Sequence, residues 1–136
     1  MIYQKSYQAS IIIIRKIIPK LPPEEKFDLG VQLRRSVKAV PRIIAEGYSK
    51  RHQRKGFQKY LDDTAGESNE IIVSLSHARD VYNVEPELII SLIDIYDKTS
   101  RQLYNLGWAW ESFGPRKTKP KPKNESPFAT GKRLTK

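Results

Sequence analysis

The segment GFQKYLDDTAGESNEIIVSLSHARDVY, residues 56–82, decides the fold class. Apolar and small residues recur in it every three or four positions, which is the spacing that places side chains on one face of an α-helix. This stripe consists of Phe57, Leu61, Thr64, Ala65, Ser68, Ile72, Leu75, Ala78 and Tyr82. The pattern predicts a long amphipathic helix that begins between Gln53 and Gly56 and ends near Tyr82.

Proline-containing breaks divide the rest of the first 111 residues into three more helices. The break PKLPPEE, residues 19–25, ends a first helix that starts near Gln4, and the break NVEPE, residues 83–87, precedes a last helix from about Pro86 to Glu111. The last helix repeats the apolar stripe with Leu88, Leu92, Ile95, Thr99, Leu103, Leu106 and Trp110. Four amphipathic helices with short connections predict an all-α, up-and-down antiparallel four-helix bundle.

The second helix, from about Pro23 to Ser49, contains two residues that normally interrupt helices. Pro41 removes one intrahelical hydrogen bond, so we expect a kink there. We expect Gly47 to close the helix in the left-handed conformation, which glycine adopts without strain. The apolar stripe of this helix consists of Leu29, Leu33, Val37, Val40 and Ile44.

The chain of 136 residues is long enough for one domain, which we expect to span residues 1–113. In residues 114–136, eight Lys or Arg side chains stand against the single acid Glu125. This segment has too few apolar side chains to offset the entropy of ordering, which predicts a disordered basic tail. Such a tail serves either as a solubilising linker or as a polyanion-binding arm, because charge alone gives non-specific attraction.

Three features bear on the cellular compartment. The chain has no cysteine, which excludes disulfides and thiolate metal sites. The apolar run in SIIIIRKII, residues 10–18, meets Arg15 and Lys16 after four isoleucines, far short of the roughly 20 residues that span a membrane. There is no cleavage site of the secretory type either. We therefore expect a cytoplasmic protein without a membrane partner.

A basic stripe lies on the second helix opposite its apolar stripe and continues into the bend that follows. Cations along one face can follow a phosphate backbone. The candidate nucleic-acid-binding residues are Arg34, Arg35, Lys38, Arg42, Lys50, Arg51, Arg54, Lys55 and Lys59. Tyr48 and Phe57 lie beside them and are candidates for stacking on unpaired bases. The same residues also fit a solvated helix face that ends in a soluble connection between two helices.

Phe27 and Val31 project onto the same face as the arginines, and apolar residues on a charged face indicate a partner surface. We expect both side chains to be buried between subunits of a homo-oligomer. The arginines would then pair across this contact with acidic residues, for which the candidates are Asp62, Asp63, Glu67 and Glu70. On this interpretation the basic face binds a neighbouring subunit or an acidic protein instead of nucleic acid.

The sequence offers little for catalysis. His52 lies in the basic bend and His77 on the third helix, and neither has a second His or Cys at metal-ligand spacing. Glu67 and Glu70 resemble half of a di-iron site, but bundle carboxylate sites use Glu-x-x-His pairs, which are absent here. An ion pair with Arg34, Arg35 or Lys59 explains these acids better. We expect no enzymatic activity, no metal and no cofactor.

Two stretches carry a resemblance to a known family. LPPEEKFDLGVQLRRSVKAVPRIIAEGYSKR, residues 21–51, and FQKYLDDTAGESNEI, residues 57–71, resemble the four-helix-bundle proteins encoded in intervening sequences of bacterial 23S ribosomal RNA genes. The matching residues are Leu21, Pro22, Glu25, Leu29, Gln32, Arg34, Arg35, Pro41, Ile44, Ala45, Glu46, Gly47, Gly66 and Glu70. The chain departs from the family pattern at Ala39, Ile43 and Glu67, where the family has Ser, Asn and Ser. The resemblance covers about residues 5 to 110 and leaves out the tail.

The resemblance implies a four-helix bundle that often assembles as a ring of five. A relative of similar build is the accessory variability determinant of diversity-generating retroelements, a basic pentameric barrel that binds the reverse transcriptase and nucleic acid. Together with the basic stripe, this implies a non-enzymatic, oligomeric protein that binds nucleic acid, with RNA favoured over DNA, and that is an accessory to a reverse transcriptase or belongs to the ribosomal-RNA branch. The alternative is a structural or protein-interaction module that binds no nucleic acid.

Overall fold

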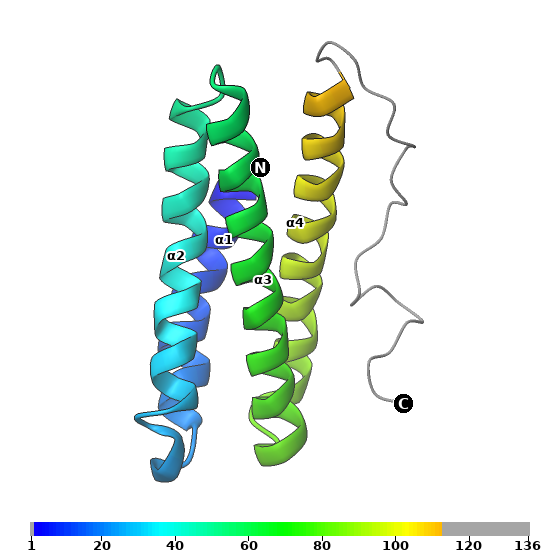
Figure 1. The fold of residues 1–136 in the computed structure, drawn as a ribbon. Coiled ribbons are helices and arrows are strands. Elements are labelled where there is room, and N and C mark those ends of the chain that lie inside the picture. Colours follow the sequence, from blue (N-terminus) through cyan, green and yellow to red (C-terminus); the bar gives the residue numbers. More distant parts are fainter. Residues whose placement is uncertain (1, 113–136) are drawn as a thin grey trace.

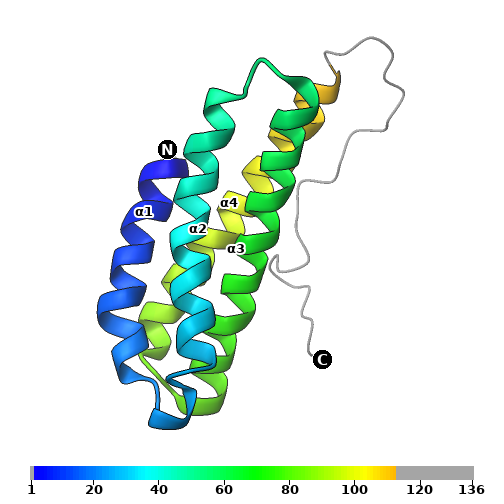
Figure 2. The same ribbon diagram turned by 60° about the vertical axis from the view of Figure 1, so that its left-hand side comes forward.

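A computed structural model describes residues 2–112, without the side chains of residue 54 and residues 106–112. Its long helices are α1 (Ile2–Ile12), α2 (Leu29–Ser49), α3 (Arg54–Tyr82) and α4 (Pro86–Ser112). The α3 helix packs against α2 and α4, and α1 packs against the other side of the same two helices (Figures 1 and 2). The predicted four-helix bundle is confirmed. The tail predicted for residues 114–136 lies outside the described residues.

One apolar core runs along the bundle and receives side chains from every long helix. Its fully or almost fully buried members are Ala9, Ile13, Ile17, Leu29, Leu33, Val37, Val40, Ile71, Ile72, Leu75, Ala78, Val84, Ile89, Leu92 and Tyr96. The stripe predicted on α3 is buried or half-buried at every position. On α4 the predicted positions Leu92, Thr99 and Leu103 are buried, but Leu88 and Ile95 are only half-buried, and the neighbouring Ile89 and Tyr96 are fully buried instead. The side chains of Leu106 and Trp110 lie outside the described part.

The first helix does not stop at Ile12 but changes its winding. A π-helical turn, Ile13–Ile17, and a 3₁₀ turn, Ile18–Lys20, carry the chain on to the first break. In the π turn the backbone N–H of Ile18 donates to the carbonyl of Ile13. Ile13 and Ile17 are fully buried in the core, and Ile12, Ile14 and Ile18 pack against it. Within residues 2–112, no helix combines the length and the apolar character needed to cross a membrane.

The two breaks meet at one end of the bundle. Pro23–Glu25 forms a 3₁₀ turn, from which one Glu25 carboxylate oxygen accepts the N–H of Leu29 at 3.2 Å and the other accepts the Tyr82 hydroxyl at 2.5 Å. Glu25 therefore caps α2, which begins at Leu29 and not near Pro23 as predicted, and links α2 to α3. An ion pair between Lys20 and Glu85 joins the same two breaks.

Left-handed backbone occurs at this end and not at the predicted glycine. Asn83, with φ of 56°, ends α3, and its N–H donates to the carbonyl of Arg79 at 2.9 Å. Gly47 instead lies inside α2, which continues through Pro41 to Ser49, so the prediction that Gly47 closes the helix in the left-handed conformation is wrong. The structure assigns Gly47 another role, because a Cβ atom there would lie only 2.8 Å from the Cβ of Tyr60 on α3.

Candidate nucleic-acid interface

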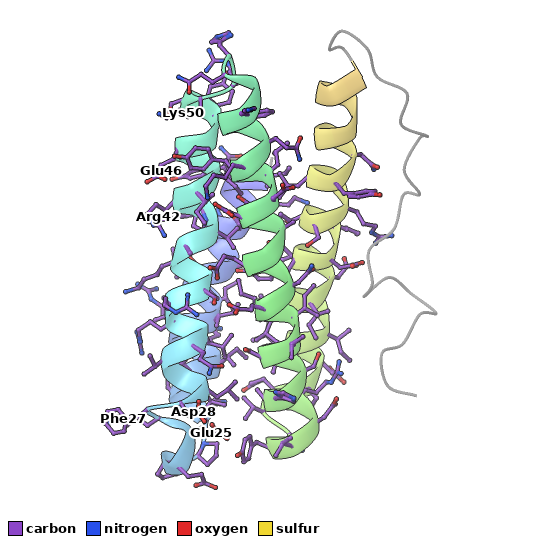
Figure 3. All side chains as sticks on the ribbon, viewed as in Figure 1. Glu25, Phe27, Asp28, Arg42, Glu46 and Lys50 are labelled. Carbon is purple, nitrogen blue, oxygen red and sulfur yellow. The ribbon has the colours of Figure 1, made fainter. Side chains whose placement is uncertain are left out.

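The bend between α2 and α3 is short and held by its own backbone. The N–H of Lys50 donates to the carbonyl of Gly47 at 2.9 Å, that of Arg51 to Tyr48 at 3.2 Å, and that of Gln53 to Lys50 at 2.8 Å. These hydrogen bonds turn the chain between Ser49 and Arg54. The bend thereby gathers basic side chains from the end of α2 and the start of α3 at the end of the bundle opposite Glu25 (Figure 3, Lys50).

Tyr48 and Arg51 form a stacked pair in this bend. The guanidinium carbon of Arg51 lies 4.1 Å from the centroid of the Tyr48 ring, and the Nη1 atom of Arg51 donates to the Tyr48 carbonyl at 2.9 Å. A guanidinium at this distance is attracted by the negative face of the ring. The Tyr48 residue is 64% exposed. The pair therefore presents an aromatic ring and a fixed cation at the surface together.

Phe57, the second candidate for base stacking, lines the same pocket as Tyr48 but is less exposed. The pocket is apolar, has a volume of about 110 Å³ and is lined by residues from all four long helices. The other lining residues are Ile2, Ile43, Ile44, Gly47, Tyr48, Tyr60, Leu61, Thr64 and Leu103. Ile43, which stands where the family has Asn, is buried beside this pocket. Of the two stacking candidates, Tyr48 is therefore the one whose ring is mainly exposed.

Three of the predicted phosphate-binding cations pair with carboxylates of their own chain. Arg35 lies 3.7 Å from Glu67 and 3.6 Å from Glu70, both on α3, and Ser36 donates a hydrogen bond to Glu70 at 3.1 Å. These acids were expected to pair with arginines across a subunit contact, and in the structure Arg35 reaches both within one chain. The prediction that an arginine explains Glu67 and Glu70 is confirmed for Arg35.

The other two paired cations each bind a carboxylate one helical turn further along. Arg42 lies 3.7 Å from Glu46, and Lys59 lies 2.9 Å from Asp63. The hydrogen bond to Asp63 raises the pKa of Lys59 above its ordinary value. All of these side chains are substantially exposed, where such pairs contribute little to stability. A phosphate would have to compete with the carboxylate at each site.

The remaining predicted cations form none of these ion pairs with carboxylates of the described part. Arg34, Lys38 and Lys55 are exposed, and Lys50 and Arg51 are half-buried. Neither Arg34 nor Lys38 has an ion-pair partner among the side chains that the structure describes. The side chain of Arg54 lies outside the described part.

The two predicted interface residues are exposed in the single chain. Phe27, in the turn before α2, is 83% exposed, and Val31 on α2 is 49% exposed. Figure 3 shows the Phe27 ring pointing away from the bundle. Lys26 lies over this ring at 5.7 Å from its centroid. Their burial between subunits remains a prediction.

Positive and negative charges are divided unevenly along the chain, and the search for single phosphate-binding residues did not reveal this division. Residues 1–59 hold 14 Lys or Arg and four acids, whereas residues 60–112 hold three Lys or Arg and ten acids. The α1–α2 half and the bend are thus basic, and the body of α3 with α4 is acidic. A count of charge by helix would have found this signal.

His52 and His77 are both exposed and lie on different elements. Within residues 2–112, no group of three or more His, Asp or Glu side chains is close enough to hold a metal ion.

A comparison with known protein families finds a match. The model of the family described as 23S rRNA-intervening sequence protein matches residues 1–105, which cover α1 to α3 and most of α4. Neither a curated protein nor a solved structure matches the chain significantly. Because the family model covers well over half of the chain, this protein belongs to the 23S rRNA-intervening sequence protein family.

Proposed function

We propose that this protein is a non-enzymatic RNA-binding bundle that contacts RNA through the bend between α2 and α3. The observation that carries the proposal is the concentration of one charge sign at this end. Between Glu46 and Asp62 the chain has five Lys or Arg residues and no acid. A cluster of this kind attracts a phosphate backbone, and a carboxylate inside it would weaken that attraction.

The Tyr48–Arg51 pair suggests which form of RNA is favoured. An exposed aromatic ring can stack on a base only where the base is unpaired, as in loops, bulges and single strands. The guanidinium of Arg51 lies against the ring and supplies a cation beside it. Lys50 and Lys55 would hold the adjoining phosphates. The bend thus suits single-stranded segments better than a continuous duplex.

Self-association belongs to the same proposal. The resemblance implies a ring of five, and a ring would present several bends to one RNA molecule. Linked weak contacts act at a high effective concentration, so the assembly would bind RNA more tightly than one chain does. An accessory role beside a reverse transcriptase is one use of such a ring. The genes next to this one would discriminate that role from the ribosomal-RNA branch.

The direct test replaces Lys50, Arg51, Arg54 and Lys55 with Ala and measures equilibrium binding to single-stranded RNA of several sequences. A matched control replaces four exposed cations away from the bend, Lys5, Arg15, Lys16 and Lys98. We expect the bend variant to weaken binding to every sequence by a similar factor, because phosphate contacts carry no sequence information. The control should bind nearly as the parent does. If the bend variant stays folded and binds as tightly as the parent, the bend is only a connection between two helices. That result would favour the alternative function as a protein-interaction module.

A further inference from the structure

The apolar pocket beside Tyr48 lies at the end of the bundle where the bend gathers basic side chains. It has a volume of about 110 Å³, is partly open to solvent, and has both Tyr48 and Phe57 among its lining residues. The eight residues between these two aromatics include four Lys or Arg and no acid. A ligand that enters the pocket therefore lies beside a concentration of positive charge, which favours a ligand that is linked to phosphates.

The walls of the pocket offer apolar contact and few hydrogen-bonding groups. Ile43, a buried lining residue, stands where the family pattern has Asn, so this chain has no amide at that point of the wall. The Thr64 hydroxyl donates to the carbonyl of Tyr60 at 2.8 Å and is not available to donate to a ligand. An engineered apolar cavity of about 150 Å³ binds benzene. The smaller pocket of this protein therefore suits the apolar edge of one six-membered ring.

The Tyr48 ring connects the pocket to the surface. Arg51 lies over one face of this ring, with its guanidinium carbon 4.1 Å from the ring centroid. A base can stack on that face only if it displaces Arg51. Because Tyr48 also lines the pocket, a base that approaches from the pocket side can stack on the ring and leave the Arg51 contact intact. Phe57 and Tyr60, the other aromatic lining residues, then lie near the same base.

The two classes of base differ in the edge that they can present to an apolar pocket. Uracil and cytosine have one edge, C5–C6, that consists of two C–H groups, and their polar groups at C2, N3 and C4 lie away from it. A purine has two fused rings, and nitrogen atoms interrupt its edges. A polar edge that enters an apolar site loses its hydrogen bonds to water without replacement, which is unfavourable. An apolar pocket of this size therefore favours pyrimidines.

We propose that the pocket receives one unpaired pyrimidine of the RNA that the bend holds, with the C5–C6 edge inward. Tyr48 stacks on the pyrimidine ring, Phe57 and Tyr60 contact its inner edge, and the polar edge around N3 stays in contact with water. Lys50 and Lys55 hold the neighbouring phosphates. The inference rests on the proposed function and names the class of base that the site selects. The phosphate contacts remain independent of sequence, and the pocket adds a preference for pyrimidines.

A photochemical experiment tests the position of the base in the unaltered protein. In a single-stranded RNA made of 5-bromouridine, each base carries on C5 a bromine atom that is close to a methyl group in size. Ultraviolet light couples C5 to an aromatic side chain in contact with it, with release of bromide, and mass spectrometry of the peptides identifies the residue. We expect coupling to Phe57 or Tyr60. Coupling to Tyr48 alone, or to none of the three aromatics, would place the base outside the pocket and overturn the proposal.

A matched pair of variants tests the preference for pyrimidines. Ile2→Trp fills the pocket from the first turn of α1, where Ile2 is half-buried and lines it, and Gln4→Trp adds the same indole at an exposed position of α1. Each protein is titrated with oligouridine and oligoadenosine of equal length, so the self-stacking of oligoadenosine affects all proteins alike. The Ile2→Trp protein should bind oligouridine about ten-fold more weakly than the parent and oligoadenosine nearly as the parent does. The Gln4→Trp protein should bind both strands nearly as the parent does.

The outcomes separate this inference from the proposed function. A parent that binds neither strand contradicts both. If the parent binds both strands and a folded Ile2→Trp protein keeps the parent's ratio of affinities, the pyrimidine pocket is wrong and the phosphate-binding bend stands. That result would leave the pocket to the other candidate occupant, an apolar side chain of a protein partner. Circular dichroism checks the fold of each variant, and if Ile2→Trp does not fold, the coupling experiment on the parent decides.

Discussion

Gly47 lies where α2 packs tightly against Tyr60 of α3. A Cβ atom at this position would lie 2.8 Å from the Cβ of Tyr60, a distance that requires the helices to shift. The sequence suggested a different reason for this glycine, namely a left-handed helix end. Local sequence does not show that Tyr60 returns to this point after the bend, so the close contact could not be predicted. What could be predicted is that α2 would end within a few residues of Gly47.

Replacing Gly47 with Ala should destabilise the bundle. Overpacking of this kind costs about 1–3 kcal/mol, which more than offsets the helix propensity of alanine. Urea denaturation followed by circular dichroism measures the difference. Gly56→Ala is the matched control, because its Cβ would meet mainly the flexible Gln53 side chain at 3.3 Å. A Gly47→Ala protein as stable as the Gly56→Ala protein would contradict the close packing.

Tyr96 carries a polar hydroxyl group into the apolar core, which lowers the stability of the fold. Its side chain is fully buried, and its hydroxyl has no hydrogen-bond partner in the part that the structure describes. Burial raises the pKa of this hydroxyl above its ordinary value, so it stays protonated. An unsatisfied buried hydroxyl costs about 1–3 kcal/mol. We expect Tyr96→Phe to raise the free energy of unfolding by about 1 kcal/mol, and a clear loss of stability in urea would show that the hydroxyl has a partner.

At the scale of the helices, periodicity and proline positions predicted most of the boundaries. The start of the second helix was predicted wrongly, because Pro23–Glu25 forms a separate 3₁₀ turn and α2 begins only at Leu29. The predicted third and fourth helices agree with α3 (Arg54–Tyr82) and α4 (Pro86–Ser112) within one or two residues. The backbone conformation at the breaks could not be predicted. The π turn at Ile13–Ile17 and the left-handed Asn83 depend on hydrogen bonds that the amino-acid composition of a segment does not specify. The candidate site was predicted as a list of cations. Which of them pair with acids on α3 depends on the antiparallel register, and sequence alone does not fix that register.

The bend gives a prediction about the form of RNA. Tyr48→Leu removes an exposed ring but keeps an apolar side chain beside the pocket. Binding to a single strand should weaken by about 1–3 kcal/mol for each base that no longer stacks, while binding to a duplex of the same length should change little. Tyr104→Leu on α4, another exposed tyrosine, is the control. Equal losses for single strands and duplexes would show that Tyr48 does not stack on bases.

Positive and negative side chains are concentrated in different parts of the molecule. The basic part comprises α1, α2 and the bend, and the acidic part comprises α4 and most of α3. Residues 113–136, which lie outside the described residues, add eight cations and one acid after the acidic half. The apolar core cluster of the described residues draws its members from residues 9–96.

Removal of residues 115–136 should therefore leave folding and assembly intact. Affinity for RNA should fall, because the segment carries a net charge of about +7 and charged arms add non-specific attraction. Circular dichroism, light scattering and an RNA titration of the shortened chain measure the three properties. Unchanged affinity would identify the segment as a spacer, and loss of the folded state would contradict its assignment outside the domain.

The central claim is that the bend between α2 and α3 holds RNA by its phosphates, and the salt dependence of binding tests it most directly. For single strands the logarithm of the binding constant falls with the logarithm of salt concentration by about 0.7 for each phosphate neutralised. The variant with Ala at Lys50, Arg51, Arg54 and Lys55 should give a shallower slope than the parent, by up to about 3. Equal slopes in the two folded proteins would contradict the account.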